Sequence, residues 1–191
     1  MFNEKGEVIP VTLVEAGPCA ITQVKKSEGK DKYDSLQLGF IKKTKKAKLS
    51  QKGKEYRYIK EFRIAKEDES SLAPFIEAKL IDVSMFAEGD KIKVAGINKG
   101  KGFQGAVKKW GFKGKLSKTH GTKHETRTLG STGVAGQSRV VKGRKMPGRM
   151  GGRKTTVRNL KIVKVDKENN LLAVEGALPG RKGALLEVSS I

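Results

Sequence analysis

The sequence predicts a mainly β fold: a closed antiparallel β-barrel with a long, irregular, basic extension inserted between barrel strands. Three observations lead to this prediction. Short runs rich in β-branched and other apolar residues recur near both ends of the chain, and Gly, Pro or charged turns separate them. A central segment, residues 97–158, has almost no such runs. Short strands on both sides of that segment favour one closed barrel, which leaves no exposed sheet edge.

The expected strands, in chain order, are 7–15, 19–25, 33–40, 79–86 and 90–97 before the extension and 159–166, 170–175 and 184–189 after it. In the first strand after the extension, apolar residues at 162, 163 and 165 surround Lys164, an alternation typical of a half-buried barrel strand. Residues 66–77 are expected to form a short helix or a loop.

The positive charge is concentrated in two segments. The chain of 191 residues has 41 Lys and Arg against 20 Asp and Glu, a net charge of +21. Residues 97–158 hold 17 of the basic residues, one acid and 13 of the 23 glycines, and residues 42–60 hold nine basic residues and one acid. The sequence therefore predicts a globular body, residues 1–96 and 159–191, with a basic arm at 42–60 and a glycine-rich extension at 97–158. The extension has too few apolar side chains to offset its conformational entropy, so it should order only on a partner.

A net charge of this size indicates an anionic partner: nucleic acid, an anionic membrane or an acidic protein. A membrane is the weakest candidate, because no run of about 18 apolar residues occurs. The N-terminus has early acidic residues and lacks the apolar stretch of a signal peptide. The single cysteine, Cys19, lies in an apolar run that favours a buried structural thiol. We therefore expect a cytoplasmic protein without a membrane partner.

Two glycine motifs are similar to nucleotide-binding loops but lack their context. Residues 100–105 fit G-x-G-x-x-G, yet further glycines interrupt the helix that a dinucleotide site needs, and no parallel strand follows. Residues 148–155 fall one residue short of a P-loop, because Arg153 stands where the glycine before Lys154 is required. We therefore expect no cofactor and no small-molecule substrate.

One histidine pair has a spacing that can bind zinc on a helix: His120 and His124 are four residues apart, and Glu125 is adjacent. Gly121 lies between them, and the flanking residues show no helical apolar face. Solvated or RNA-facing imidazoles are favoured, and neither a metal site nor a catalytic site is expected. A metal-dependent nuclease that uses these residues is the rival among enzymes.

Basic and aromatic residues alternate with glycine in NKGKGFQGAVKKWGFKGK, which begins at Asn98. The lysines can neutralise phosphates, and Phe103, Trp110 and Phe112 can stack on unpaired bases or fill gaps between RNA helices. The alternative for Trp110 is a small local core at the base of the extension, and the sequence does not decide between the two. The pattern favours irregular RNA cavities over a regular groove, and a DNA-associated protein is the rival among binding proteins.

Several longer blocks are similar to one family over essentially the whole chain. They are VEAGPCAITQVK, LQLGF, EFR at 61–63, NKGKGFQGAVKKWGF, KGRKMPGRMGGRKTTVRNLKIVKVD and NLLAVEGALPG. In this order they resemble the large-subunit ribosomal protein three family, bacterial type. The resemblance implies a β-barrel of the translation-protein type and an extension that threads through 23S ribosomal RNA (rRNA) toward the peptidyl transferase centre, with its tip at 127–150. It also implies early binding near the 3′-terminal domain of that RNA, a role in nucleating subunit assembly, and contacts with neighbouring large-subunit proteins.

Two departures from the family pattern affect these expectations. Members usually begin earlier, with a glycine- and lysine-rich strand, so we expect either an upstream start or one missing barrel strand. The tip of the family commonly carries Pro-Gly before its basic run, whereas residues 136–139 here are one residue shorter. The resemblance implies an N-methylated tip glutamine in some bacteria, and Gln137 is the nearest candidate.

The sequence thus predicts a structural constituent of the large ribosomal subunit, located in the ribosome, that binds 23S rRNA and is not an enzyme. Most of its affinity is expected from phosphate contacts. The residues expected to contact rRNA are Lys99, Lys101, Phe103, Lys108, Lys109, Trp110, Lys113, His120, Arg127, Gln137, Arg139, Lys142, Arg144, Lys145, Arg149, Arg153, Lys154 and Arg158 in the extension, and Lys43, Lys45 and Lys46 in the arm.

Overall fold

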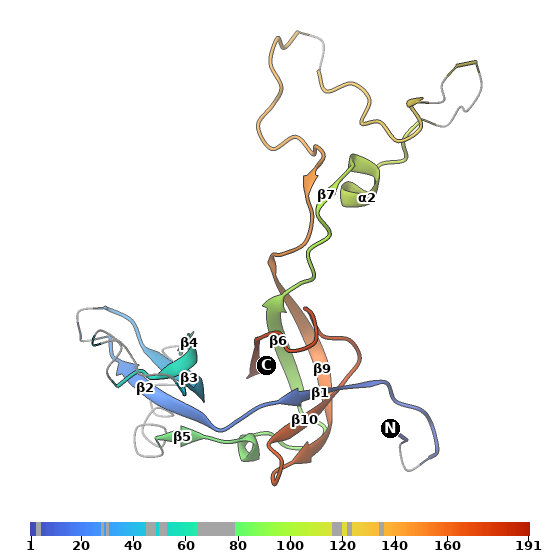
Figure 1. Cartoon of the computed structure of the whole chain (residues 1–191). Helices are drawn as coiled ribbons and strands as arrows, with labels where there is room; N and C mark the ends of the chain where they lie inside the picture. Colours follow the sequence, from blue (N-terminus) through green and yellow to red (C-terminus); the bar gives the residue numbers. More distant parts are fainter. Residues whose placement is uncertain are drawn as a thin grey trace. The chain divides into compact units, whose positions relative to one another are not determined.

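The protein is represented by a computed structural model (Figure 1). It describes residues 1–2, 5–27, 29, 31–44, 49, 53–64, 79–115, 120–121, 124–133 and 136–191. The elements up to the extension are β1 (Val11–Glu15), β2 (Cys19–Lys25), β3 (Ser35–Lys42), β4 (Tyr56–Arg63), β5 (Leu80–Ile81), the 3-10 helix η3 (Val83–Met85) and β6 (Lys91–Ile97). The later elements are β7 (Phe103–Gln104), α2 (Ala106–Trp110), β8 (Gly148–Arg149), β9 (Lys154–Asp166), β10 (Leu171–Glu175) and β11 (Leu186–Ser190).

The strands form antiparallel sheets, which confirms the mainly β prediction. Hydrogen bonds connect them in the order β1-β10-β9-β6-β11 in one sheet, β4-β3-β2-β5 in a second, and β7-β8 in a two-stranded ribbon. Over the described ranges these sheets are open, so the closed barrel stays a prediction. No helix in the same ranges is long and apolar enough to cross a bilayer.

The chain divides into two compact units. The first comprises Met1–Ile92, Asn159–Ala177 and Ser190–Ile191, and the second comprises Lys93–Arg158 and Leu178–Ser189.

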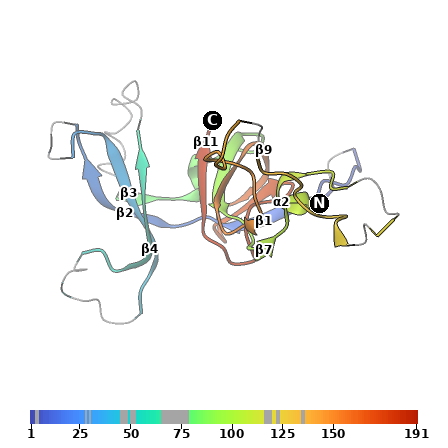
Figure 2. The same cartoon turned by 90° about the horizontal axis from the view of Figure 1, so that it is seen from above.

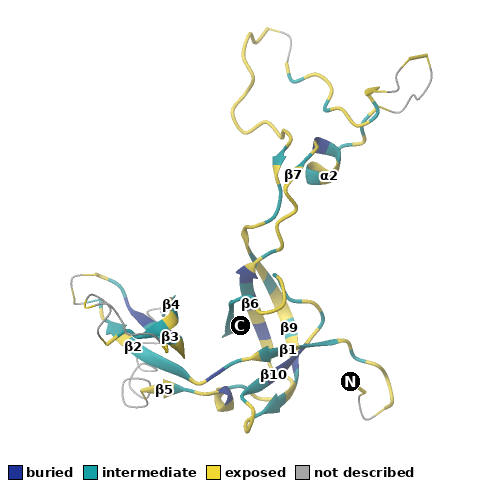
Figure 3. Ribbon diagram, in the orientation of Figure 1, coloured by how far each residue is buried: buried dark blue, intermediate teal, exposed yellow. Residues whose placement is uncertain are grey.

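The core of the first unit lies where β10 pairs with β1 and with β9. Ile162, Leu172 and Val174 are fully buried there, and Figure 3 shows the buried part of β10. Burying a side chain of this size contributes about 1.5–3 kcal/mol. The alternation expected around Lys164 agrees with the burial of its neighbours, because Lys164 is exposed between the half-buried Val163 and Val165. Ile162 is also buried, beside a register shift in the pairing of β9 with β10.

The second sheet of the first unit contains a strand that the sequence pattern does not reveal. β4 pairs antiparallel with β3, which pairs with β2 (Figure 2). This additional strand, YRYIKEFR, carries basic residues on both faces and begins inside the expected basic arm, so its composition hides its alternation. The Tyr56 ring explains the glycine at position 39 of β3: a Cβ on Gly39 would lie 2.4 Å from Cδ2 of that ring.

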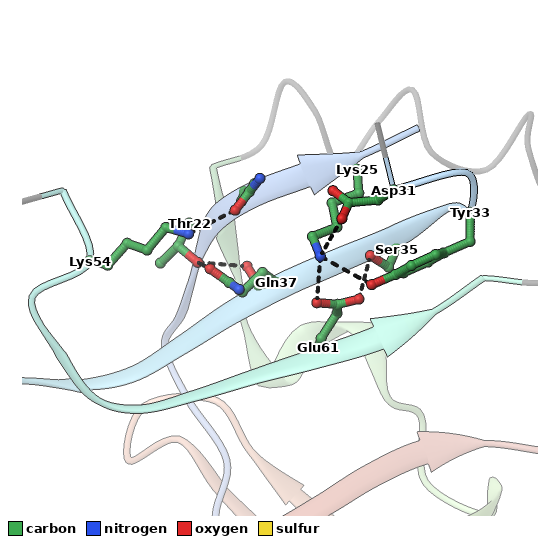
Figure 4. Close-up of polar contacts among 9 residues, drawn as sticks. Thr22, Lys25, Asp31, Tyr33, Ser35, Gln37, Lys54 and Glu61 are labelled. Carbon is green, nitrogen blue, oxygen red and sulfur yellow. Dashed lines mark hydrogen bonds and ion pairs between the residues drawn. The ribbon is translucent and has the colours of Figure 1, made fainter. Parts of the chain in front are cut away.

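A polar network fastens β2, β3 and β4 together (Figure 4). The Lys25 ammonium lies 3.1 Å from Oε2 of Glu61 and donates to the Tyr33 hydroxyl at 3.1 Å, while Ser35 donates to Oε1 of Glu61 at 3.0 Å. Hydrogen bonds from Tyr33, Lys25 and Ser35 lower the pKa of Glu61, and hydrogen bonds to Tyr33 and Glu61 raise that of Lys25. Both groups are therefore charged at neutral pH, and the network fixes the register of three strands.

Several expected strand boundaries are wrong. Only Leu80–Ile81 of the strand expected at 79–86 forms a strand; Val83–Met85 forms the 3-10 helix η3, in which Val83 is buried. Ile81, Val83 and Met85 alternate with Asp82 and Ser84 as in a half-buried strand, but Val83 is buried in the 3-10 turn while Met85 is 53% exposed, so the local alternation does not decide the backbone conformation here. The strand expected at 7–15 begins at Val11, and the one expected at 159–166 begins at Lys154, inside the expected extension.

Two smaller expectations concern residues 66–77 and Cys19. Residues 66–77 lie outside the described residues. Burial and then the nearby Asp82 carboxylate raise the pKa of the Cys19 thiol, which therefore stays protonated at neutral pH. That chemistry agrees with a structural thiol rather than a nucleophile.

Candidate nucleic-acid interface

The base of the extension is a paired stem within the second unit. We define the stem as residues 98–104 and 148–155. Lys101 donates its backbone N–H to the carbonyl of Met150 at 2.9 Å, and Met150 donates back to Gly102 at 2.9 Å. The β7-β8 ribbon continues this ladder. Backbone hydrogen bonds therefore hold together two segments that lie far apart in the sequence.

Asn98 closes one end of the stem with both its backbone and its side chain. Its backbone N–H donates to the carbonyl of Arg153 at 3.0 Å. Its side-chain oxygen accepts the N–H of Arg153 at 3.1 Å, and its side-chain nitrogen donates to Oγ1 of Thr155 at 3.0 Å. No pattern in the sequence indicates this role, because a lone Asn before a Lys-Gly run is typical of any loop.

Gly151 is the stem position where only glycine fits. Its φ is +75°, a left-handed conformation that favours glycine. A Cβ there would lie 2.1 Å from the carbonyl oxygen of Lys99 and 2.9 Å from Cα of Gly100. The two strands can therefore approach this closely only because position 151 has no side chain.

Trp110 fastens the short helix α2 to the chain that returns to the stem. The helix ends at Gly111, whose φ is +74° and whose N–H donates to the carbonyl of Val107 at 2.9 Å. The indole N–H of Trp110 donates to the carbonyl of Met146 at 2.8 Å. The ammonium groups of Lys109 and Lys145 lie 5.0 and 5.8 Å from the ring centroid. These contacts favour the local-anchor interpretation of Trp110.

Beyond α2, few hydrogen bonds connect the chain, and most described residues are exposed (Figure 3). Lys115 forms an ion pair with Glu125 and donates its backbone N–H to Thr126 at 3.2 Å. Arg144 donates to the carbonyl of Ser131 at 2.7 Å. The one acidic residue of the segment 97–158 is thus paired with a lysine, and it does not oppose an incoming anion.

The expected contact residues fall into three groups. In the stem, α2 and β9 lie Lys99, Lys101, Phe103, Lys108, Lys109, Trp110, Arg149, Arg153, Lys154 and Arg158. In turns and irregular backbone lie Lys113, His120, Arg127, Gln137, Arg139, Lys142, Arg144 and Lys145. Lys43 directly follows β3, while Lys45 and Lys46 lie outside the described residues. Lys154 pairs with Glu187, so it has less free charge for a phosphate than its neighbours.

Within the described ranges, no three His, Cys, Asp or Glu side chains are placed to hold a metal ion. His120 has a φ of +54°, a turn conformation and not a helical one. His120 itself therefore lacks the helical conformation in which two histidines four residues apart can share a metal ion.

The chain is similar to known proteins of one family along nearly its whole length. Residues 20–177 match the sequence profile of the family described as ribosomal protein L3. The chain is 45% identical to large ribosomal subunit protein uL3 of Desulfitobacterium hafniense (strain Y51), over 97% of this chain and 88% of that protein. It is 43% identical to the uL3 protein of Desulforudis audaxviator (strain MP104C), over 99% of this chain and 89% of that protein. It is 44% identical to the uL3 protein of Thermosipho africanus (strain TCF52B), over 94% of this chain and 87% of that protein.

The family resemblance inferred from the sequence blocks is therefore confirmed. This family is a structural component of the ribosome and not an enzyme. The exposed basic segment, its paired stem and the full-length similarity lead to one identification: the chain belongs to the ribosomal protein L3 family.

Proposed function

We propose that the chain binds 23S rRNA through the segment 97–158, helps nucleate assembly of the large subunit and reaches toward the peptidyl transferase centre. The observation that carries the proposal is the charge of this segment: 17 basic residues and one acid, and the acid is paired with Lys115. We include in the proposal a cytoplasmic location, contacts with neighbouring large-subunit proteins, and closure of the strands into a barrel of the translation-protein type.

Phosphate contacts would supply most of the affinity. Each Lys or Arg that neutralises a phosphate releases a counterion, and this gain does not depend on sequence. The guanidinium and ammonium groups of the stem and of the irregular residues beyond it are exposed, so they can reach a backbone without prior unfolding. Position along the RNA would then be set by shape and by a few base contacts.

The stem and the rest of the segment have different roles in this proposal. The stem is hydrogen-bonded within the chain, so binding does not have to order it. The described residues between 111 and 145 have few internal contacts, and we propose that this part orders on the RNA, which costs conformational entropy. The sequence predicts that all of 97–158 orders only on a partner; we propose this now for the outer part alone.

RNA is favoured over duplex DNA because the described residues of the outer part form no helix or ribbon of a size that fits a regular groove. A competition experiment tests this choice. Fragments of 23S rRNA from the 3′-terminal domain should displace the protein from a labelled rRNA fragment at far lower concentration than duplex DNA of equal length. Equal displacement by the two would favour the DNA-associated rival.

Reconstitution of large subunits tests the position near the catalytic centre. The variant replaces residues 130–145 with a short Gly-Ser linker and keeps Met146, the partner of Trp110. We expect the variant to enter the particles, because the stem and the arm still neutralise phosphates, and single-turnover peptidyl transfer to be slowed. Absence of the variant from particles would make these residues an assembly element. Normal occupancy together with a normal rate would contradict a role at the centre.

A further inference from the structure

We propose that Phe103 is a stacking platform for an unpaired base of the bound RNA, and that Trp110 fastens the extension and is not the stacking ring. The proposal rests on the proposed function, since it names the part of the RNA that this one side chain takes. The sequence leaves open whether Trp110 stacks or anchors a local core, and the surroundings of the two rings in the structure separate their roles.

The two rings differ in their contacts. Trp110 donates its N–H to Met146 and has two ammonium groups over its ring. Phe103 is 76% exposed, against 39% for Trp110. Among the described residues, cations lie over the rings of Trp110, Tyr33 and Tyr58, and none lies over Phe103. Phe103 is therefore the aromatic face of the stem that is open to a ligand.

The chain positions close to Phe103 carry little bulk. Gly102 precedes it and Gly105 lies two residues after it. A Cβ added at either glycine, or at Gly100, would meet no atom within 4 Å. A flat base can thus approach the ring without displacing any side chain of these neighbours, as stacking requires.

The charge around the ring favours a polyanion. Lys99 and Lys101 lie on the same strand of the stem, and Arg149 is the register partner of Phe103 on β8. The Arg149 guanidinium is turned toward Gly152, where an added Cβ would lie 3.1 Å from Nη2, so it does not cover the phenyl ring. An exposed ring with cations on the same strand and no cation over its face combines a stacking surface with phosphate neutralisation.

A single exposed phenylalanine is common on protein surfaces and needs no ligand by itself. Here its neighbours along the chain are glycine, glutamine and lysine, and its register partner on β8 is Arg149, so the positions beside it and across from it in the ribbon are not apolar. One ring flanked by cations matches one nucleotide, and we therefore take an unpaired base as the occupant.

Affinity for a 23S rRNA fragment that contains unpaired loops tests the inference with the full-length chain. Phe103→Ala should weaken binding about 10-fold, because stacking on one base is worth roughly that much. Phe103→Leu, which keeps an apolar side chain but cannot stack, should weaken it nearly as much. Phe103→Trp should bind like the parent chain. Since no charge changes, the salt dependence of binding should be the same for all three variants.

Two controls separate this inference from the proposed function. Leu13→Ala, at a residue on β1 that is 65% exposed, removes a similar apolar group outside the segment and should leave binding unchanged. On a fully paired RNA duplex, Phe103→Ala should bind like the parent. If Phe103→Leu binds the looped RNA as well as the parent does, or if Phe103→Ala weakens duplex binding equally, stacking is refuted. If the parent chain itself does not bind rRNA, the proposed function fails and not the stacking inference alone.

Discussion

Glycine substitutions in the stem give a graded test of its structure. Gly100 and Gly102 lie on one strand of the paired stem and Gly151 lies on the other, and the three differ in what a methyl group would meet. At Gly100 the methyl group meets nothing within 4 Å and φ is not left-handed. At Gly102 it also meets nothing, but φ is +66°. At Gly151 φ is +75°, and the Cβ would lie 2.1 Å from the Lys99 carbonyl oxygen.

The expected costs follow from these differences. Gly100→Ala should change local stability by less than about 0.5 kcal/mol. Gly102→Ala adds left-handed strain of about 1–2 kcal/mol. Gly151→Ala adds the same strain, and the Lys99 carbonyl must also retreat from 2.1 Å to at least 3.0 Å, because Cβ atoms do not come closer than that. That shift disturbs one or more neighbouring backbone hydrogen bonds, at about 1 kcal/mol each. We therefore expect a total of about 3 kcal/mol from strain and lost hydrogen bonds together.

Hydrogen exchange of the Lys101 and Met150 amides measures this cost directly, since both donate across the stem. Exchange should be nearly unchanged in Gly100→Ala, about 10-fold faster in Gly102→Ala and about 100-fold faster, or fully unprotected, in Gly151→Ala. Exchange in Gly151→Ala that matches Gly100→Ala would refute the stem. Unprotected Lys101 and Met150 amides in the parent chain would refute it equally.

Three further predictions concern other contacts. Trp110→Phe removes the N–H that donates to Met146 but keeps a ring, so circular dichroism of the body should not change while exchange of the Gly111 amide, which caps α2, becomes faster. Gly39→Ala should lower the free energy of unfolding by about 1–3 kcal/mol, because its methyl group overlaps the Tyr56 ring. The double variant with Tyr56→Ala should lose less stability than the sum of the losses in the two single variants. Strictly additive losses would mean that the ring does not contact residue 39. Because the folded state lowers the pKa of Glu61, the stability that Glu61 contributes is complete above its ordinary pKa of 4.5 and is lost as the pH falls through the lower pKa of the folded state. Glu61→Gln should therefore flatten the acid side of a plot of melting temperature against pH. An unchanged plot would count against the polar network.

The fold class and the main basic segment could be predicted from the sequence because they depend on local pattern. Strand β2 matches its expected range, since apolar residues at 19–25 are bounded by Pro18 and by charged residues. β4 could not be predicted in this way, because its charged residues interrupt any apolar alternation. What makes it a strand is pairing with β3 along its length, a long-range contact that no local pattern contains.

The stem, like β4, depends on long-range pairing and could not be predicted from a local pattern. Its hydrogen bonds join residues about 50 positions apart, and the loop between them has no periodicity that would indicate closure. The glycines stand out as a group in the sequence, but only the structure shows that Gly151 is required by a backbone approach while Gly100 is not. Likewise, the sequence left open whether Trp110 stacks on a base or anchors a local core, and the hydrogen bond from its indole N–H to the Met146 carbonyl favours the anchor.

The central claim is that the cations of the stem and of the residues beyond it neutralise rRNA phosphates. The most direct measurement is the affinity of the full chain for a 23S rRNA fragment as a function of salt concentration. For on the order of ten phosphate contacts, a plot of log affinity against log salt should fall with a slope of about −7 to −9. The double variant Arg149→Gln and Arg153→Gln should reduce the steepness by about 2, because two phosphate contacts are lost. Its matched control, Lys167→Gln and Lys182→Gln, removes the same net charge from exposed residues outside the segment and should leave the slope unchanged. An affinity that does not depend on salt, or an equal loss of slope in both double variants, would contradict the claim.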